Sequence, residues 1–187
     1  MPIDRSVLAA FGAAGLILVA GAVTVQSQGE KDMPFGGKEN VAFAKQLWSA
    51  LKAAKLAGPN RINVEPFVGN EPHGAIQQVL STNVTVDKRS ARVIVKVNHG
   101  GEGATVDTVY ANPNKYLGAY TVMFKKPAGY DPENKNWFWA KYTANGEIVK
   151  NPKGMWLAGR VAKGMDKGCI ACHTVLGGDD REVLLKE

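Results

Sequence analysis

The segment GCIACHT, residues 168–174, contains both cysteines of the chain and one of its three histidines. A Cys-x-x-Cys-His run is the attachment signature of c-type haem. The two thiols add to the two vinyl groups of the porphyrin, a helical turn presents both thiols on one side, and the histidine points its imidazole at the iron. The sequence therefore predicts one covalent haem c on a short C-terminal helix, attached through Cys169 and Cys172, with His173 as the proximal ligand.

A pair of cysteines can also form a disulfide, a redox dithiol or part of a zinc site, and the sequence does not exclude these alternatives. An exported domain with two cysteines often contains a disulfide, and Cys-x-x-Cys occurs in redox dithiols and zinc sites. A redox dithiol usually accompanies a βαβ pattern, which this chain lacks. The adjacent histidine favours haem attachment over these alternatives.

The N-terminal part of the chain has a different character. A single arginine precedes an uncharged, mostly apolar run from Ser6 to Gly29. This pattern predicts a secretory signal peptide or a membrane anchor at residues 1–28, with a buried core helix as the alternative. Either of the first two would put the protein in the periplasm, soluble or tethered to the inner membrane. We expect a linker at 29–38 and one haem domain at 39–187.

Composition fits this organisation and excludes one class of partner. The 187 residues are 45% hydrophobic and 21% charged, which is enough apolar material for a single globular core. The formal net charge of +6 suits an acidic partner or an anionic membrane surface. Because lysines and arginines are dispersed and no nucleic-acid motif occurs, we expect no nucleic-acid binding.

Apolar spacing predicts an α+β fold. A helix is expected over 39–58, where apolar residues recur at three- and four-residue intervals and Gly58-Pro59 supplies a stop; Trp48 belongs to its buried face. Short β-branched and aromatic runs separated by turn residues predict strands within 75–87, 92–101, 117–126 and 136–142. Since no long helices separate these runs, the sheet should be mostly antiparallel, with the N-terminal helix and the short haem-attachment helix beside it.

The second axial position of the iron has no obvious ligand in the sequence. The fourteen residues after His173 contain neither Met nor His, so a sixth ligand would come from upstream. The candidates are His73, His99, Met123, Met155 and Met165. Met165 is too close to Cys169 to reach the opposite side, Met123 has a strand-core pattern, and both histidines lie in turns. We therefore expect a five-coordinate iron with an open distal face, which suits small-ligand chemistry.

Lys96 interrupts the otherwise apolar strand RVIVKVN. Strand alternation places Val93, Val95 and Val97 on one face, and Ile94 and Lys96 on the other. Taken alone, the pattern favours a lysine whose ammonium reaches water at a sheet edge, because buried lysines are rare.

Four segments together resemble the cytochrome P-460 family and its relative, the cytochrome c′-β group. In chain order they are PHGAIQQVLSTN, VIVKVNHGG, TVMFKKPAGYDPENKNWFWAKYTANGE and CIACH, and the resemblance covers residues 60–180. It implies a mostly antiparallel sheet, a homodimer and a haem bound at Cys169, Cys172 and His173. It also places Lys96 where cytochrome P-460 has a lysine bonded to the porphyrin edge.

The resemblance implies two activities. Members with the lysine bond oxidise hydroxylamine, and members without it bind nitric oxide beneath aromatic caps. Candidate cap residues are Phe124, Trp137, Phe138 and Trp139, with ordinary sheet packing as the alternative for each.

Three functions follow for the chain. The first is oxidation of hydroxylamine or related nitrogen species, with electrons leaving to a partner cytochrome and a carboxylate (Glu102, Asp107 or Glu147) accepting protons. The second is nitric oxide binding or scavenging, and the third is simple electron transfer.

Overall fold

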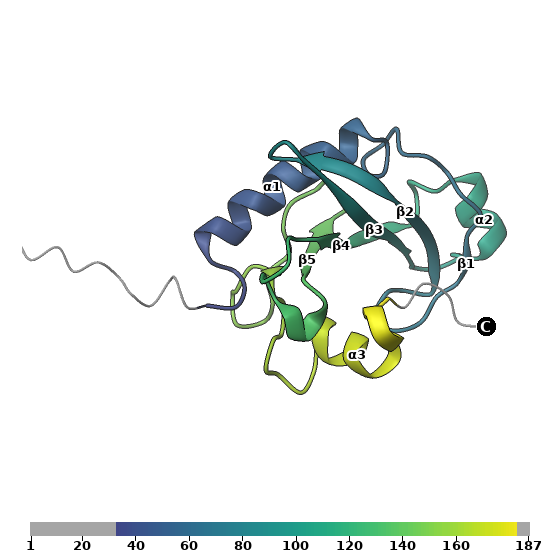
Figure 1. The fold of residues 1–187 in the computed structure, drawn as a ribbon. Helices are drawn as coiled ribbons and strands as arrows, with labels where there is room; N and C mark the ends of the chain where they lie inside the picture. The colour runs from purple at the N-terminus through teal and green to yellow at the C-terminus, as the bar shows by residue number, and fades with distance from the viewer. Residues whose placement is uncertain (1–32, 183–187) are drawn as a thin grey trace, which may run out of the picture.

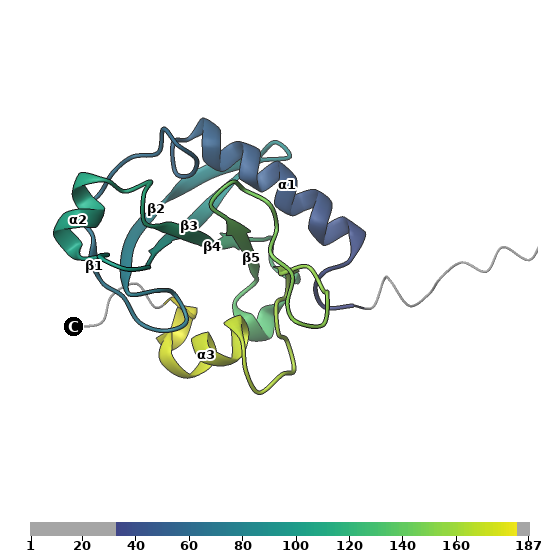
Figure 2. The same cartoon turned by 180° about the vertical axis from the view of Figure 1, so that it is seen from behind.

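The computed structural model describes residues 33–182, which form one antiparallel sheet with helices on both faces (Figure 1). The six strands are hydrogen-bonded in chain order, each antiparallel to the next. They are β1 (Phe67–Val68), β2 (Ile76–Val86), β3 (Arg89–His99), β4 (Leu117–Lys125), β5 (Trp137–Thr143) and β6 (Ala158–Gly159). Helix α1 (Lys38–Ala53) lies across one face, and α3 (Cys169–Leu176) lies on the other side of the sheet, as the reverse view also shows (Figure 2). The α+β prediction is confirmed.

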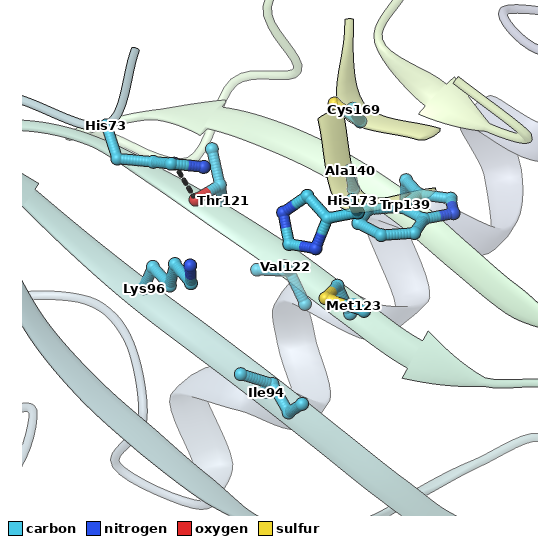
Figure 3. Close-up of a pocket in the computed structure, with 10 residues that line it drawn as sticks. All are labelled: His73, Ile94, Lys96, Thr121, Val122, Met123, Trp139, Ala140, Cys169 and His173. Atoms are coloured by element: carbon cyan, nitrogen blue, oxygen red, sulfur yellow. Dashed lines mark hydrogen bonds between the residues drawn. The ribbon is translucent and has the colours of Figure 1, made fainter. Parts of the chain in front are cut away.

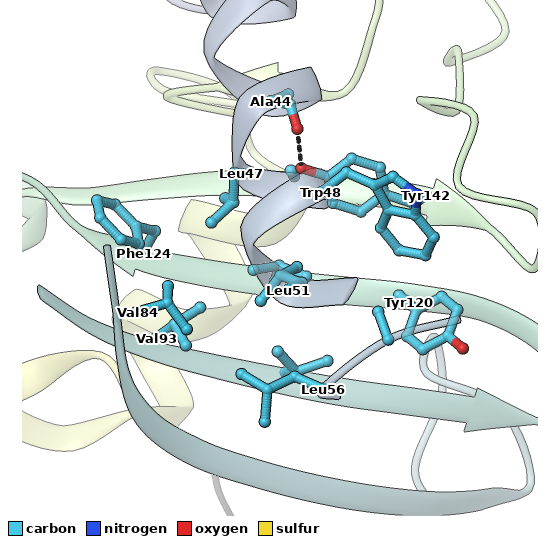
Figure 4. Packing of buried hydrophobic residues seen from close by; sticks show 14 of the residues in the cluster. Ala44, Leu47, Trp48, Leu51, Leu56, Val84, Val93, Tyr120, Phe124 and Tyr142 are labelled. Carbon is cyan, nitrogen blue, oxygen red and sulfur yellow. Dashed lines mark hydrogen bonds between the residues drawn. The ribbon is translucent and has the colours of Figure 1, made fainter. Parts of the chain in front are cut away.

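Helix α1 buries the stripe that its apolar spacing predicts. Ala44, Leu47, Trp48 and Leu51 are all buried against the sheet (Figure 4). The helix ends five residues before the expected stop, because Lys55 adopts the left-handed conformation at φ 55°. The amides of Lys55 and Leu56 then donate to the carbonyls of Lys52 and Leu51, which is the Schellman arrangement that closes a helix.

The two faces of the sheet contribute to two separate apolar clusters. On β3, Val93, Val95 and Val97 join the larger cluster under α1, while Ile94 belongs to the smaller cluster near α3. The predicted alternation is therefore confirmed, and Lys96 lies on the α3 face. The edge interpretation of Lys96 is wrong, because β3 is a central strand between β2 and β4.

Short helical turns connect the strands. Helix α2 (Val106–Ala111) precedes β4 and begins with a capping box, in which the side-chain hydroxyls of Thr105 and Thr108 each accept a hydrogen bond from the other residue's backbone amide. The 3₁₀ turn η2 (Pro132–Asn134) precedes β5, and a second 3₁₀ turn, η3 (Gly178–Asp180), follows α3.

The segment before α1 packs on the domain. Phe35 is buried and pairs with Gly159, and the Gly36 amide donates to the carbonyl of Ala158 at 2.8 Å. The expected signal peptide or anchor at 1–28 lies outside the described residues. Within 33–182, no helix has the length and apolar character needed to cross a bilayer.

Candidate functional site

A pocket lies between the α3 face of the sheet and α3 itself (Figure 3). Strands β3, β4 and β5 form its floor, α3 supplies one wall, and the turn before β2 supplies another. The lining residues are His73, Ile94, Lys96, Thr121, Val122, Met123, Trp139, Ala140, Cys169 and His173. The pocket thus combines an apolar floor with the nitrogen- or sulfur-bearing side chains of His73, Lys96, Met123, Cys169 and His173.

Helix α3 places the predicted attachment residues at this pocket. Cys169 and Cys172 are three positions apart on the helix, so they lie on neighbouring turns of one side. Cys169 lines the pocket and Cys172 is exposed, and both are free thiols. Burial raises the pKa of the Cys169 thiol to about 11. A thiol whose pKa is raised is a poor nucleophile at neutral pH.

His173 has one ring nitrogen engaged and the other available. Its Nδ1 lies 2.6 Å from the backbone carbonyl oxygen of Arg181, so Nδ1 carries the proton and donates it to that acceptor. Nε2 is then left with a free lone pair, which is how second-shell hydrogen bonds prepare a histidine to bind metal. The ring packs edge-on against Trp139, with centroids 4.7 Å apart. Burial is the main cause that lowers the pKa of His173 to about 4, so the imidazole is neutral.

Lys96 points into the same pocket with only 6% of its surface exposed. Among the described residues, no hydrogen bond or ion pair involves its ammonium, and no acidic side chain lines the pocket. Desolvation by burial lowers the pKa of Lys96 to about 8. A buried lysine without a partner is costly, and it leaves a partly neutral amine directed at the space beside His173.

Of the five candidate sixth ligands, the pocket contains His73 and Met123. The Nδ1 of His73 is 3.0 Å from the Thr121 hydroxyl, and Met123 is buried among the apolar residues of the α3 face. His99 lies outside this pocket, where its Nε2 pairs with the Gln78 side chain at 2.9 Å. Met155 packs at the edge of the α3-face cluster and Met165 is 42% exposed; neither lines the pocket.

The aromatic candidates divide between the two faces. Trp139 lines the pocket, and Trp137 lies on the same face, where its indole N–H donates to the carbonyl of Asp180. Phe124 and Phe138 face α1 instead and contact Phe43. These two phenylalanines cannot cap the pocket, because alternation along β4 and β5 turns them to the opposite side.

The carboxylates proposed as proton acceptors are not at the pocket. Glu102, Asp107 and Glu147 are all exposed, and none lines the pocket. Each lies in a turn or at a helix start, away from the strand segments that form the pocket floor. The structure therefore corrects this part of the expectation.

Thr121 is a site residue that sequence reasoning missed. It lies opposite Lys96 in the β3–β4 register and holds the ring of His73 through its hydroxyl. The alternation of β4 contained the signal, since Tyr120 and Val122 face α1 and Thr121 and Met123 face the other way.

These residues fit a c-type haem. One cysteine is in the pocket wall and its partner is at the surface, so the group would be enclosed on one side and exposed at one edge. His173 offers a free nitrogen, and Lys96 is a buried group in need of a partner. Within residues 33–182, no cluster of three or more His, Cys, Asp or Glu side chains could hold a bare metal ion, which opposes the zinc alternative.

Comparison with known proteins adds no assignment. No family model matches the chain, and no curated protein or solved structure gives a significant match.

Proposed function

We propose that this chain is an exported c-type monohaem protein that oxidises hydroxylamine or a related nitrogen species. One observation carries the proposal: α3 aims Cys169 and the unengaged Nε2 of His173 into the pocket that also contains the unpaired Lys96. A haem bound here would supply a redox-active iron able to accept electrons from a nitrogenous ligand.

Each residue has a distinct role in this proposal. Cys169 and Cys172 would tether the porphyrin, and His173, whose ring is oriented by the Arg181 carbonyl, would hold the iron. Lys96 would lie at the porphyrin edge, where the family that the sequence resembles has a lysine bonded to the porphyrin, and burial lowers the pKa of its amine to about 8. Trp139 packs edge-on against the His173 ring.

The remaining partners follow from the chemistry. Oxidation of a small nitrogen compound releases electrons, so a partner cytochrome must accept them. The net charge of +6 suits docking to an acidic redox partner. The family resemblance suggests that the protein forms a homodimer. The N-terminal pattern suggests that the protein is periplasmic, either soluble or tethered to the membrane.

Nitric oxide binding is the second candidate, and one observation favours it. Among the described residues, no carboxylate lines the pocket, whereas hydroxylamine oxidation releases protons that an acceptor must take. Binding of nitric oxide releases no proton, so a mostly apolar pocket without a base is sufficient for it.

Mass spectrometry of the denatured holoprotein tests the attachment. Production in a host that matures c-type cytochromes should give the mass of the chain plus one haem, and Cys172→Ser should abolish the double thioether attachment. Peptide mapping should locate a third bond at Lys96. A colourless product with both thiols free to titrate would refute the proposal.

The optical spectrum separates the two candidates. A red-shifted, broadened Soret band that is lost in Lys96→Ala, together with hydroxylamine turnover, supports oxidation. A normal Soret band that is the same in both proteins and responds to nitric oxide supports the second candidate. Lys141→Ala is the matched control, since Lys141 lies on β5, which is separated from β3 by β4, and does not line this pocket.

A further inference from the structure

His73 and His173 extend toward each other from opposite sides of the pocket (Figure 3). Their ring centroids are 6.2 Å apart and their planes are nearly perpendicular, at 87°. Each ring uses its Nδ1 elsewhere, His73 on the Thr121 hydroxyl and His173 on the Arg181 carbonyl. Among the described residues, neither Nε2 has a hydrogen-bond partner.

The ring separation is that expected of two imidazoles binding one metal from opposite sides. A metal–imidazole bond is about 2 Å long and the nitrogen is roughly 1 Å from the ring centre, so two such rings have centroids about 6 Å apart. A histidine that only hydrogen-bonded a metal-bound ligand would need about 2–3 Å more. The centroid separation of 6.2 Å in the structure agrees with direct ligation.

The turn that carries His73 is fixed by close backbone contacts. The His73 amide donates to the Asn70 carbonyl at 2.8 Å, and the Gly69 amide donates to the Ala75 carbonyl at 2.7 Å. Gly74 has φ +92°, and a Cβ there would lie 2.6 Å from the carbonyl oxygen of His99. The backbone on both sides of His73 is therefore packed on the sheet, which positions the imidazole before any ligand arrives.

His73 also borders a second, more open pocket. This outer pocket is lined by the His73 turn, the end of β3 and the start of β4, with Lys141 at its margin. The imidazole is the side chain common to both pockets. A rotation of His73 toward the outer pocket would uncover its position opposite His173.

We propose that His73 is the second axial ligand of the resting protein and that a small nitrogenous ligand displaces it toward the outer pocket. This inference rests on the proposed haem attachment. The distal side of the iron, which is expected from the sequence to be vacant, is then occupied by His73 and opens only when this imidazole leaves. His73 then controls ligand entry, and the Thr121 hydroxyl sets how firmly the ring is held.

Electron paramagnetic resonance and optical spectra of the ferric holoprotein test the proposal. The wild-type protein should be low-spin, and His73→Ala and His73→Gln should both be high-spin, the second keeping a side chain of similar size. Added imidazole should restore the low-spin spectrum of His73→Ala. Met123→Leu is the matched control, because Met123 lines the same pocket and should leave the low-spin signal unchanged.

Kinetics of cyanide binding supply a second readout. Cyanide should bind His73→Ala at least tenfold faster than wild type, and Thr121→Val should give an intermediate rate, because the ring is less firmly held.

Three outcomes would overturn the inference: a high-spin wild-type protein, a low-spin His73→Ala protein without added imidazole, or loss of the low-spin signal in Met123→Leu. If no covalent haem is found, the proposed function fails and this inference fails with it. Covalent haem with a high-spin wild-type spectrum overturns the His73 assignment alone and leaves the proposed function standing.

Discussion

Replacing Lys96 by methionine should stabilise the polypeptide in a pH-dependent manner. Burial lowers the pKa of Lys96 from 10.5 to about 8. Below about pH 8 the folded and unfolded chains both bind the proton, and the folded state bears the full cost of the buried ammonium. Between pH 8 and 10.5 the folded chain releases the proton while the unfolded chain retains it, so the cost declines as pH rises.

The magnitude follows from the difference between the two pKa values. At about 1.4 kcal/mol per pKa unit, Lys96→Met should raise the free energy of unfolding by about 3 kcal/mol at pH 7. By the same relation, the stabilisation by Lys96→Met should fall to about 1 kcal/mol at pH 10. Methionine has a similar length and suits the apolar neighbours Ile94 and Met123, so packing should change little.

Urea unfolding of residues 29–187, produced in a cytoplasm where haem is not attached, measures this difference at pH 7 to 10. Lys45→Met is the matched control, because Lys45 is exposed on α1 and should change stability by less than about 0.5 kcal/mol at every pH. A Lys96→Met effect equal at pH 7 and pH 10, or a destabilised variant, would show that the ammonium is not buried without a partner.

Two further substitutions test the packing of α1 on the sheet. Gly146→Ala should lower the free energy of unfolding by more than about 3 kcal/mol, measured by thermal or urea unfolding, because a Cβ there would lie 2.1 Å from the Trp48 ring and φ is +90°. Gly129→Ala is the control. Its φ is +91° and no atom lies within 4 Å of the added Cβ, so it should lower the free energy of unfolding only by the backbone cost of about 1–2 kcal/mol. Equal losses would contradict the clash with Trp48. Tyr142→Phe should cost about 1 kcal/mol, since its hydroxyl donates to the Ala44 carbonyl at 2.8 Å, and an unchanged urea midpoint would contradict a net contribution from that bond.

Periodicity in the sequence was enough to predict most of the fold. The α1 stripe around Leu47 and Trp48, the alternation of β3 and the short helix at Cys169 are local patterns, and each is confirmed. The end of α1 was misplaced because Lys55, rather than a glycine, takes the left-handed position. Helix α2 had no assignment, since its cap pairs two threonines and lacks the acidic residue of the usual capping box.

The candidate site was only partly predictable for a different reason. Cys169, Cys172 and His173 are adjacent in sequence, so their spacing alone signals their chemistry. His73 reaches the pocket through the packing of Gly74 on β3, and no local pattern reports such a contact. The exposed Glu102, Asp107 and Glu147 were candidates by residue type alone, and their place in the sheet connections keeps them from the pocket.

The segregation of the two clusters onto opposite faces of one sheet has a consequence for redesign. Neighbouring positions on β3 face opposite sides of the sheet. Val95 and Val97 pack in the cluster under α1, while Ile94 and Lys96 line the pocket. A combinatorial library confined to pocket-facing positions such as Ile94, Met123 and Trp139 would therefore leave the α1 core intact. The lining of the pocket and the packing of α1 are then separable in this domain, and substitutions at the pocket test the smaller cluster without disturbing the larger one.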